Sequence, residues 1–148
     1  MPFMLTIGGM QISSRFTMAV HVLVAIDVYE EHSKVTSTML AESVNANPVV
    51  IRRLIQQLKT SGLINVVRGT GGATLAQPDT DITLLDVFVA VHAVDDDGFF
   101  HFHELNPKDA LAQQMHKLLD EVLDDSYHSL ENVLAQVTIA DLAQQVQQ

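Results

Sequence analysis

The sequence predicts a mainly α-helical fold with a small β-hairpin wing, a winged helix-turn-helix, followed by a long C-terminal dimerisation helix. Three observations lead to this fold class. Residues 36–60 contain two short helix patterns separated by a three-residue turn. Residues 63–76 contain two runs of branched side chains around a glycine-rich turn, which predicts a hairpin. Apolar residues then recur at helical spacing from Pro107 onwards, which predicts the long helix.

The first helix is predicted from Ser13 or Ser14, which can cap it, to about Glu31. It is apolar on nearly every side, so we expect it at the centre of the core. Its longest apolar stretch, Phe16–Tyr29, is too short to cross a bilayer, so no membrane segment is expected. Residues 1–9 lack the features of an export signal, which predicts a cytoplasmic protein with a short N-terminal extension.

The third helix is the candidate DNA-recognition helix. It should begin at Pro48, because Asn47 can cap it and a first-turn proline favours such a start. One apolar stripe at helical spacing faces the core and consists of Ile51, Leu54, Ile55 and Leu58. The opposite side then carries Val49, Val50, Arg52, Arg53, Gln56 and Lys59. Valine suits thymine methyl groups, arginine suits guanine and glutamine suits adenine, although a solvated basic face is the alternative.

A hairpin follows Gly62, which ends the third helix. Strands are predicted over Leu63–Val67 and Ala73–Ala76, and the glycines between them allow the backbone to approach a phosphate or sugar closely. A phosphate-binding nucleotide loop would need a lysine and a following helix, and neither is present. We therefore expect the hairpin to contact DNA through Arg68, Gly69, Thr70 and Gly71.

The charge distribution is strongly divided along the chain. The net charge is -10, yet residues 1–76 hold six basic and four acidic residues, which leaves -12 for residues 77–148. Double-stranded DNA should therefore approach the first half and be repelled by the second. Arg15, another of the six basic residues, is assigned to the same DNA-binding face.

The C-terminal half is predicted to be helical. Thr83 and Asp86 form a capping box for a fourth helix that reaches about His92. Asn106 and Pro107 repeat the cap-and-proline start, and a helix of about 25 residues follows. Its apolar seam is the predicted homodimer contact and consists of Leu111, Met115, Leu118, Val122, Leu130 and Val133. An intramolecular bundle is the alternative, and a last helix capped by Thr138 and Asp141 should pack near the first.

Several ordered motifs resemble one known family. They are 47–53 (NPVVIRR), 58–64 (LKTSGLI), 67–72 (VRGTGG) and 82–87 (ITLLDV). Together they resemble the Rrf-type family of bacterial winged-helix transcriptional regulators, which includes the iron-sulfur cluster assembly regulator, the nitric-oxide-sensitive repressor and a repressor of cysteine metabolism. The resemblance extends from about Met10 to Val146. It implies base contacts by residues near 47–53, a minor-groove contact by Arg68, and a long helix that crosses to a second subunit.

The chain departs from that family in its sensor segment. Members that bind an iron-sulfur cluster use cysteines in the segment that corresponds to Asp95–Asn106, and this sequence contains no cysteine. The family's cluster is therefore not expected, and we expect no cofactor. His101 and His103 with nearby carboxylates suit a divalent metal. Two histidines without a third spaced ligand fit a polar loop better, so no metal site is assigned.

These features predict a sequence-specific DNA-binding transcriptional regulator, a repressor that acts as a homodimer on a palindromic operator. The domains would be an extension (1–9), the winged helix-turn-helix (10–92), a loop (93–106), and the dimerisation and C-terminal helices (107–148). A winged-helix module that binds protein is the alternative. An enzyme is not expected, because no nucleophile or acid-base pair stands in a defined motif. No residue pattern identifies an effector molecule or ion.

Overall fold

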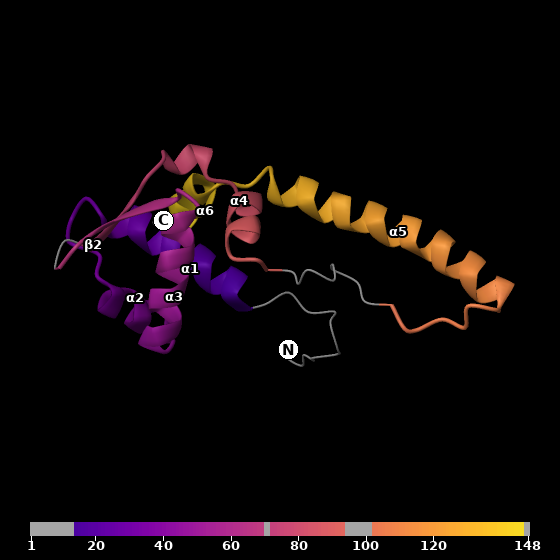
Figure 1. Ribbon diagram of the computed structural model, residues 1–148. Coiled ribbons are helices and arrows are strands. Elements are labelled where there is room, and N and C mark those ends of the chain that lie inside the picture. The colour runs from indigo at the N-terminus through magenta and orange to yellow at the C-terminus, as the bar shows by residue number, and fades with distance from the viewer. Residues whose placement is uncertain (1–13, 70–71, 94–101, 147–148) are drawn as a thin grey trace.

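The computed structural model describes residues 14–69, 72–93 and 102–146 of the chain (Figure 1). It confirms the predicted fold class, since helices predominate and a single antiparallel hairpin follows the third helix. The elements are α1 (Ser14–Tyr29), α2 (Ser37–Val44), α3 (Pro48–Thr60), β1 (Ile64–Val67), β2 (Gly72–Leu75), the 3-10 helix η2 (Asp79–Asp81), α4 (Leu84–Ala90), α5 (Ala110–Leu134) and α6 (Ile139–Val146). None of the helices in these ranges has the length and apolar character needed to cross a membrane.

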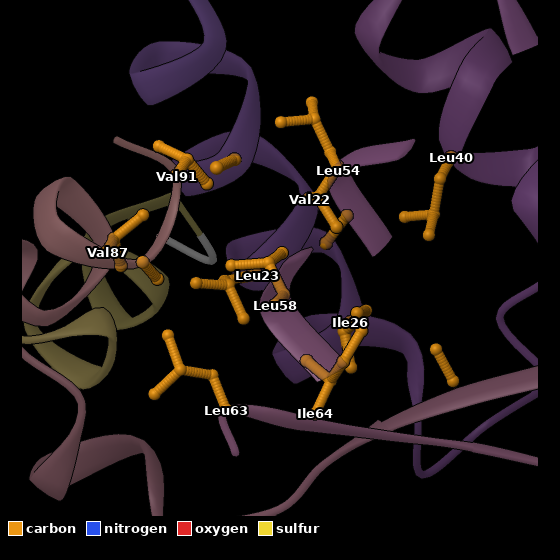
Figure 2. Close-up of a cluster of buried hydrophobic side chains, with 14 of the residues drawn as sticks. Val22, Leu23, Ile26, Leu40, Leu54, Leu58, Leu63, Ile64, Val87 and Val91 are labelled. Carbon is orange, nitrogen blue, oxygen red and sulfur yellow. The ribbon is translucent and has the colours of Figure 1, made fainter. Parts of the chain in front are cut away.

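Helix α1 lies at the centre of the core, as its apolar composition predicts. It contacts α2, α3, α4, α6 and β2. Val22, Leu23 and Ile26 are fully buried in it, and Figure 2 shows them among side chains from α3, α4 and the hairpin. The helix ends at Tyr29, two positions before the predicted Glu31. One central helix thus holds the helix-turn-helix, the hairpin and the C-terminal helix together.

The helix-turn-helix is set by local hydrogen bonds. The Met39 amide donates to the Thr36 hydroxyl oxygen at 3.2 Å, which begins α2. Asn45 adopts a left-handed conformation with φ of 59° and turns the chain towards α3. The Val49 amide then donates to Asn47 Oδ1 at 2.8 Å, so α3 begins at Pro48 as predicted. The three-residue turn therefore fixes the direction of the candidate recognition helix.

The hairpin is fastened to the body at its return strand. Strands β1 and β2 pair antiparallel, with Ile64 opposite Leu75, each strand starting one position from its predicted start. The Ala73 amide donates to the Val35 carbonyl oxygen at 2.9 Å, and the Leu75 amide donates to Glu30 Oε1 at 3.1 Å. These two bonds therefore hold β2 against the body along its length.

Capping boxes begin both α4 and α6, and the two helix starts are joined by a backbone bridge. Thr83 and Asp86 exchange hydrogen bonds at the start of α4, and Thr138 and Asp141 do so before α6. The Ile139 amide also donates to the Ile82 carbonyl oxygen at 2.9 Å, which joins the two helix starts. Helix α6 packs against α1, as the sequence predicts.

Helix α5 extends away from the rest of the chain (Figure 1). It begins at Ala110 and not at Pro107, because the Leu111 amide donates to Asp109 Oδ1 and makes Asp109 the cap. None of its residues is fully buried. Only its C-terminal end packs against the core, through Tyr127, Leu130 and Leu134. The described residues therefore form no intramolecular bundle around this helix.

Candidate nucleic-acid interface

The outward side of α3 carries the basic and amide side chains that the sequence assigned to DNA. Ile51, Leu54 and Leu58 are buried beneath the helix. The opposite side is exposed and consists of Asn47, Pro48, Val49, Arg52, Arg53, Gln56 and Lys59. This arrangement follows from the helical period, because residues on the side opposite the core stripe must face outward. Helix α3 therefore presents a row of hydrogen-bond donors to solvent.

Val50 is a correction to the predicted surface. The sequence places Val49 and Val50 together as an exposed pair, but only Val49 is exposed, at 52%. Val50 is half-buried and packs against the core. Val50 lies at the edge of the buried stripe of α3, so part of its side chain contacts the core and part remains exposed. Val49 is the better placed of the two for contact with a thymine methyl group.

Helix α3 and the wing share one hollow of about 310 Å³. Its lining combines two predicted residues of α3, Arg52 and Gln56, with Gly69 of the wing. No acidic residue belongs to this lining, so the hollow is compatible with a polyanion. The structure thus brings together two parts of the predicted DNA surface that are separated in sequence.

The same hollow includes residues that the sequence reasoning missed. Thr36 and Ser37, at the start of α2, line it together with Val66 and Val67 of β1. Val67 is 56% exposed, so the wing presents an apolar side chain next to α3. The sequence does identify Thr36 as a residue at the start of α2, because it can cap that helix. It does not show that Val66 and Val67 line the hollow, because that depends on how β1 pairs with β2.

Arg68 is exposed at the turn of the wing, followed by Gly69 with φ of 75°. Glycine adopts this left-handed conformation without the strain that a Cβ would bring. Thr70 and Gly71, also assigned to DNA from the sequence, lie outside the described residues. The turn of the wing therefore begins with the exposed guanidinium group of Arg68 and a glycine in the left-handed conformation.

Arg15, which the sequence assigned to the DNA-binding face, makes two hydrogen bonds within its own chain. Its Nε donates to the Val91 carbonyl oxygen at 3.1 Å, and its Nη2 donates to the His92 carbonyl oxygen at 2.5 Å. Both carbonyls follow the end of α4, where helix carbonyl groups lack partners and a positive charge is favourable. Arg15 does not line the hollow between α3 and the wing. The structure therefore assigns this side chain to joining α1 to α4.

An apolar stripe runs along α5, and the described residues of the chain leave most of it exposed. Leu111, Leu118, Val122 and Val133 are each at least 60% exposed, and Met115 is 38% exposed. Leu130, predicted as part of this seam, instead packs half-buried against the core of its own chain. The physical reason is that the last turns of α5 rest on α4, where Tyr127 lies 6.5 Å from Phe88 between ring centres. A continuous exposed apolar surface of this kind marks an interaction site.

The segment that was compared with a sensor loop is described only in part. Asp95, Asp96, Asp97 and His101 lie outside the described residues, and His103 is exposed. Phe102 packs on the α5 side chain His116, with ring centres 4.2 Å apart. Within the ranges that the structure describes, no three histidine or carboxylate side chains are grouped to hold a metal ion.

Comparisons with known proteins agree with this geometry. The profile of the Rrf2 family, described as iron-dependent transcriptional regulators, matches residues 12–145. YwnA of Bacillus subtilis, named as an HTH-type transcriptional regulator, is 36% identical over 132 residues, which cover 88% of this chain and 96% of YwnA. The crystal structure of a protein described as DNA-binding superposes with a TM-score of 0.70 at 33% identity, covering 87% of this chain and 98% of that protein. IscR of T. potens shares the fold, with a TM-score of 0.69 at 22% identity over 93% of this chain and 89% of its own.

Proposed function

Because the chain belongs to the Rrf2 family of transcriptional regulators, we propose that it binds a palindromic DNA operator as a homodimer and represses transcription there. The observation that carries the proposal is the exposed donor row of α3 beside a wing that shares its hollow. The family consists of regulators and not of enzymes, so no catalytic step is assigned. The protein would act on DNA in the cytoplasm.

Helix α3 would enter the major groove. Arg52, Arg53 and Gln56 are exposed on one side of the helix, and their side chains match guanine and adenine edges. Val49 offers methyl groups at the N-terminal end, where recognition helices contact bases. Lys59, one helical turn from the base-contacting residues, suits a phosphate contact. The buried stripe beneath α3 holds this surface rigid on α1.

The wing would reach the neighbouring minor groove. Arg68 lies at its turn, and arginine is the side chain most often inserted into narrow minor grooves. The return strand of the wing is held by the bonds from Ala73 to Val35 and from Leu75 to Glu30, which would keep Arg68 at a fixed position relative to α3.

Two copies would pair through α5. The exposed seam of Leu111, Met115, Leu118 and Val122 has no cover within the described part of the chain, and a second copy supplies an identical surface. Two-fold symmetry would then place two α3 helices about 34 Å apart, in successive major grooves of an imperfect palindrome. Occupation of such an operator would block access of the transcription machinery.

An iron-sulfur cluster does not fit this chain, although the family is described as iron-dependent. Such clusters are held by cysteine thiolates, and the sequence contains none. The proposed DNA binding therefore includes no step that depends on a cluster.

The test begins with selection of bound DNA from random oligonucleotides, which should yield two half-sites one helical turn apart. Gel-shift titration on that operator then compares Arg53→Ala with Lys117→Ala. Both variants remove one exposed positive charge, but only Arg53 lies on α3. We expect Arg53→Ala to weaken binding by about 5- to 150-fold, the range for loss of one bidentate base contact, and Lys117→Ala to leave it nearly unchanged.

Equal effects of the two substitutions would show that charge alone governs binding, and would refute the assignment of α3 to bases. Absence of any salt-dependent retention on DNA would instead favour the winged helix as a protein-binding module. Arg68→Ala tests the wing separately, because it should lower affinity at fixed salt while the half-site sequence stays the same.

A further inference from the structure

We propose that a hollow between α1, α2 and α6 binds a small organic anion with an apolar body, such as a carboxylate of about eight carbon atoms. The hollow has a volume of about 440 Å³, within the roughly 300–1,000 Å³ range of small-molecule sites. It is separate from the α3 and wing surface. Its lining consists of His21, Val24, Ala25, Val28, Tyr29, Ser43, Leu142 and Val146.

The walls of the hollow are largely aliphatic. Val24 and Val28 of α1 face Leu142 and Val146 of α6, and the short side chain of Ala25, 6% exposed, leaves depth between them. This surface exists because α1 is apolar on every side, so that a strip remains after α3 and α4 have covered the others. An apolar ligand body would remove this strip from water, which is favourable in proportion to the area covered.

One edge of the hollow carries a polar pair. His21 Nε2 and Ser43 Oγ are 2.9 Å apart and join α1 to α2. With the imidazole Nε2–H donating to the hydroxyl oxygen, the hydroxyl proton of Ser43 is available to a ligand oxygen. A carboxylate is the acceptor that gains most from such a donor, because charge-assisted hydrogen bonds are stronger than neutral ones.

The charge of the lining fits an anion. The chain has 18 acidic residues and a net charge of -10, yet none of the residues that line the hollow is acidic. A carboxylate placed beside Ser43 would therefore meet a hydroxyl donor oriented by His21, and no like charge within the lining. The lining is therefore compatible with an anion.

The site has a direct route to the recognition helix, and this part of the inference rests on the proposed function. Ser43 precedes Asn45 by two positions, and the left-handed conformation of Asn45 sets the turn into α3. An anion that draws Ser43 towards α1 and α6 would change the angle at which α2 presents that turn. The bound molecule would thus act as the effector that alters DNA affinity.

Calorimetric titration tests the site with octanoate and octan-1-ol, which share a chain length and differ in the head group. We expect saturable octanoate binding, one molecule per chain, and weaker binding of the alcohol. His21→Ala removes the partner that orients the Ser43 hydroxyl, so it should lower octanoate affinity about tenfold and leave the alcohol nearly unchanged, as expected when one hydrogen bond to a charged group is weakened. His128→Ala is the matched control, since His128 is an exposed histidine on α5 outside the hollow.

Val28→Glu provides a second variant, because it places a carboxylate inside the hollow and should abolish octanoate binding. Circular dichroism establishes that each variant is folded. Unchanged octanoate affinity in Val28→Glu, or equal effects of His21→Ala and His128→Ala, would overturn the proposal. So would binding that appears only in monomeric Leu118→Glu, because a second copy would then fill the hollow. DNA affinity measured without octanoate tests the proposed function independently.

Discussion

Gly72→Ala should destabilise the fold far more than an alanine at the other positive-φ glycines of the same region. Gly72 has φ of 79°, and an added Cβ would lie 2.9 Å from the Val35 nitrogen and 3.0 Å from the Val35 oxygen. Both are backbone atoms, so the clash can be relieved only by moving β2 away from Val35. That movement breaks the 2.9 Å hydrogen bond from the Ala73 amide to the Val35 carbonyl oxygen.

The cost follows from two contributions. The left-handed conformation costs an alanine about 1–2 kcal/mol, and loss of the hydrogen bond adds about 1 kcal/mol. We therefore expect Gly72→Ala to lower the free energy of unfolding by about 2–3 kcal/mol. Gly69→Ala is the matched control, with φ of 75° and no atom within 4 Å of its added Cβ. It should lose only the conformational part, about 1–2 kcal/mol.

Urea unfolding followed by far-ultraviolet circular dichroism measures both variants, with Gly62→Ala as a further control because its φ is 78° and its added Cβ meets nothing within 4 Å. We expect a gap of about 1 kcal/mol or more between Gly72→Ala and the two controls. Equal losses in all three variants would refute the close approach of β2 to Val35. A change in the slope with urea would report altered compactness and requires separate treatment.

Three further predictions test other parts of the structure. Burial and a hydrogen bond with Asp79 raise the pKa of Asp27 from 3.8 to about 7. The folded chain therefore holds this proton more tightly than the unfolded chain, so stability should fall as the pH rises from about 4 to about 7, and Asp27→Asn should flatten this dependence in urea unfolding. Leu118→Glu should yield monomers in sedimentation velocity, whereas Val89→Glu, at a side chain of similar exposure on α4, should not. Arg15→Ala should lower the free energy of unfolding by about 1 kcal/mol, because the carbonyls after α4 lose a donor, and operator affinity measured on the folded variant tests the predicted DNA contact of Arg15.

Helix starts were predictable from the sequence where a side chain bonds to a nearby amide. Asn47 before Pro48 and the Thr83–Asp86 pair gave correct starts, because their hydrogen bonds span only two or three positions. The alternation of buried and exposed positions along α3 followed from the helical period in the same way. Local sequence patterns are therefore enough to predict which side of α3 forms the candidate DNA surface.

Features that depend on contacts between distant segments could not be predicted from the sequence. Arg15 bonds to carbonyls 76 and 77 positions away, and no local pattern reports such a pairing. Val50 and Leu130 lie at the edges of apolar stripes, where the neighbouring elements decide which face is covered. The hollow beside α6 depends on how α6 packs on α1, a choice made by tertiary contacts and not by the period of either helix.

Helix α5 has no fully buried residue, so its stability should depend on the concentration of the protein. In the proposed homodimer, α5 would gain most of its stability from packing against the second copy. Mass action would then make helix content and melting temperature rise with protein concentration. At low concentrations in the cell, the amount of dimer would grow as the square of the monomer concentration. A modest change in synthesis of the protein would then produce a steeper change in occupancy of the operator.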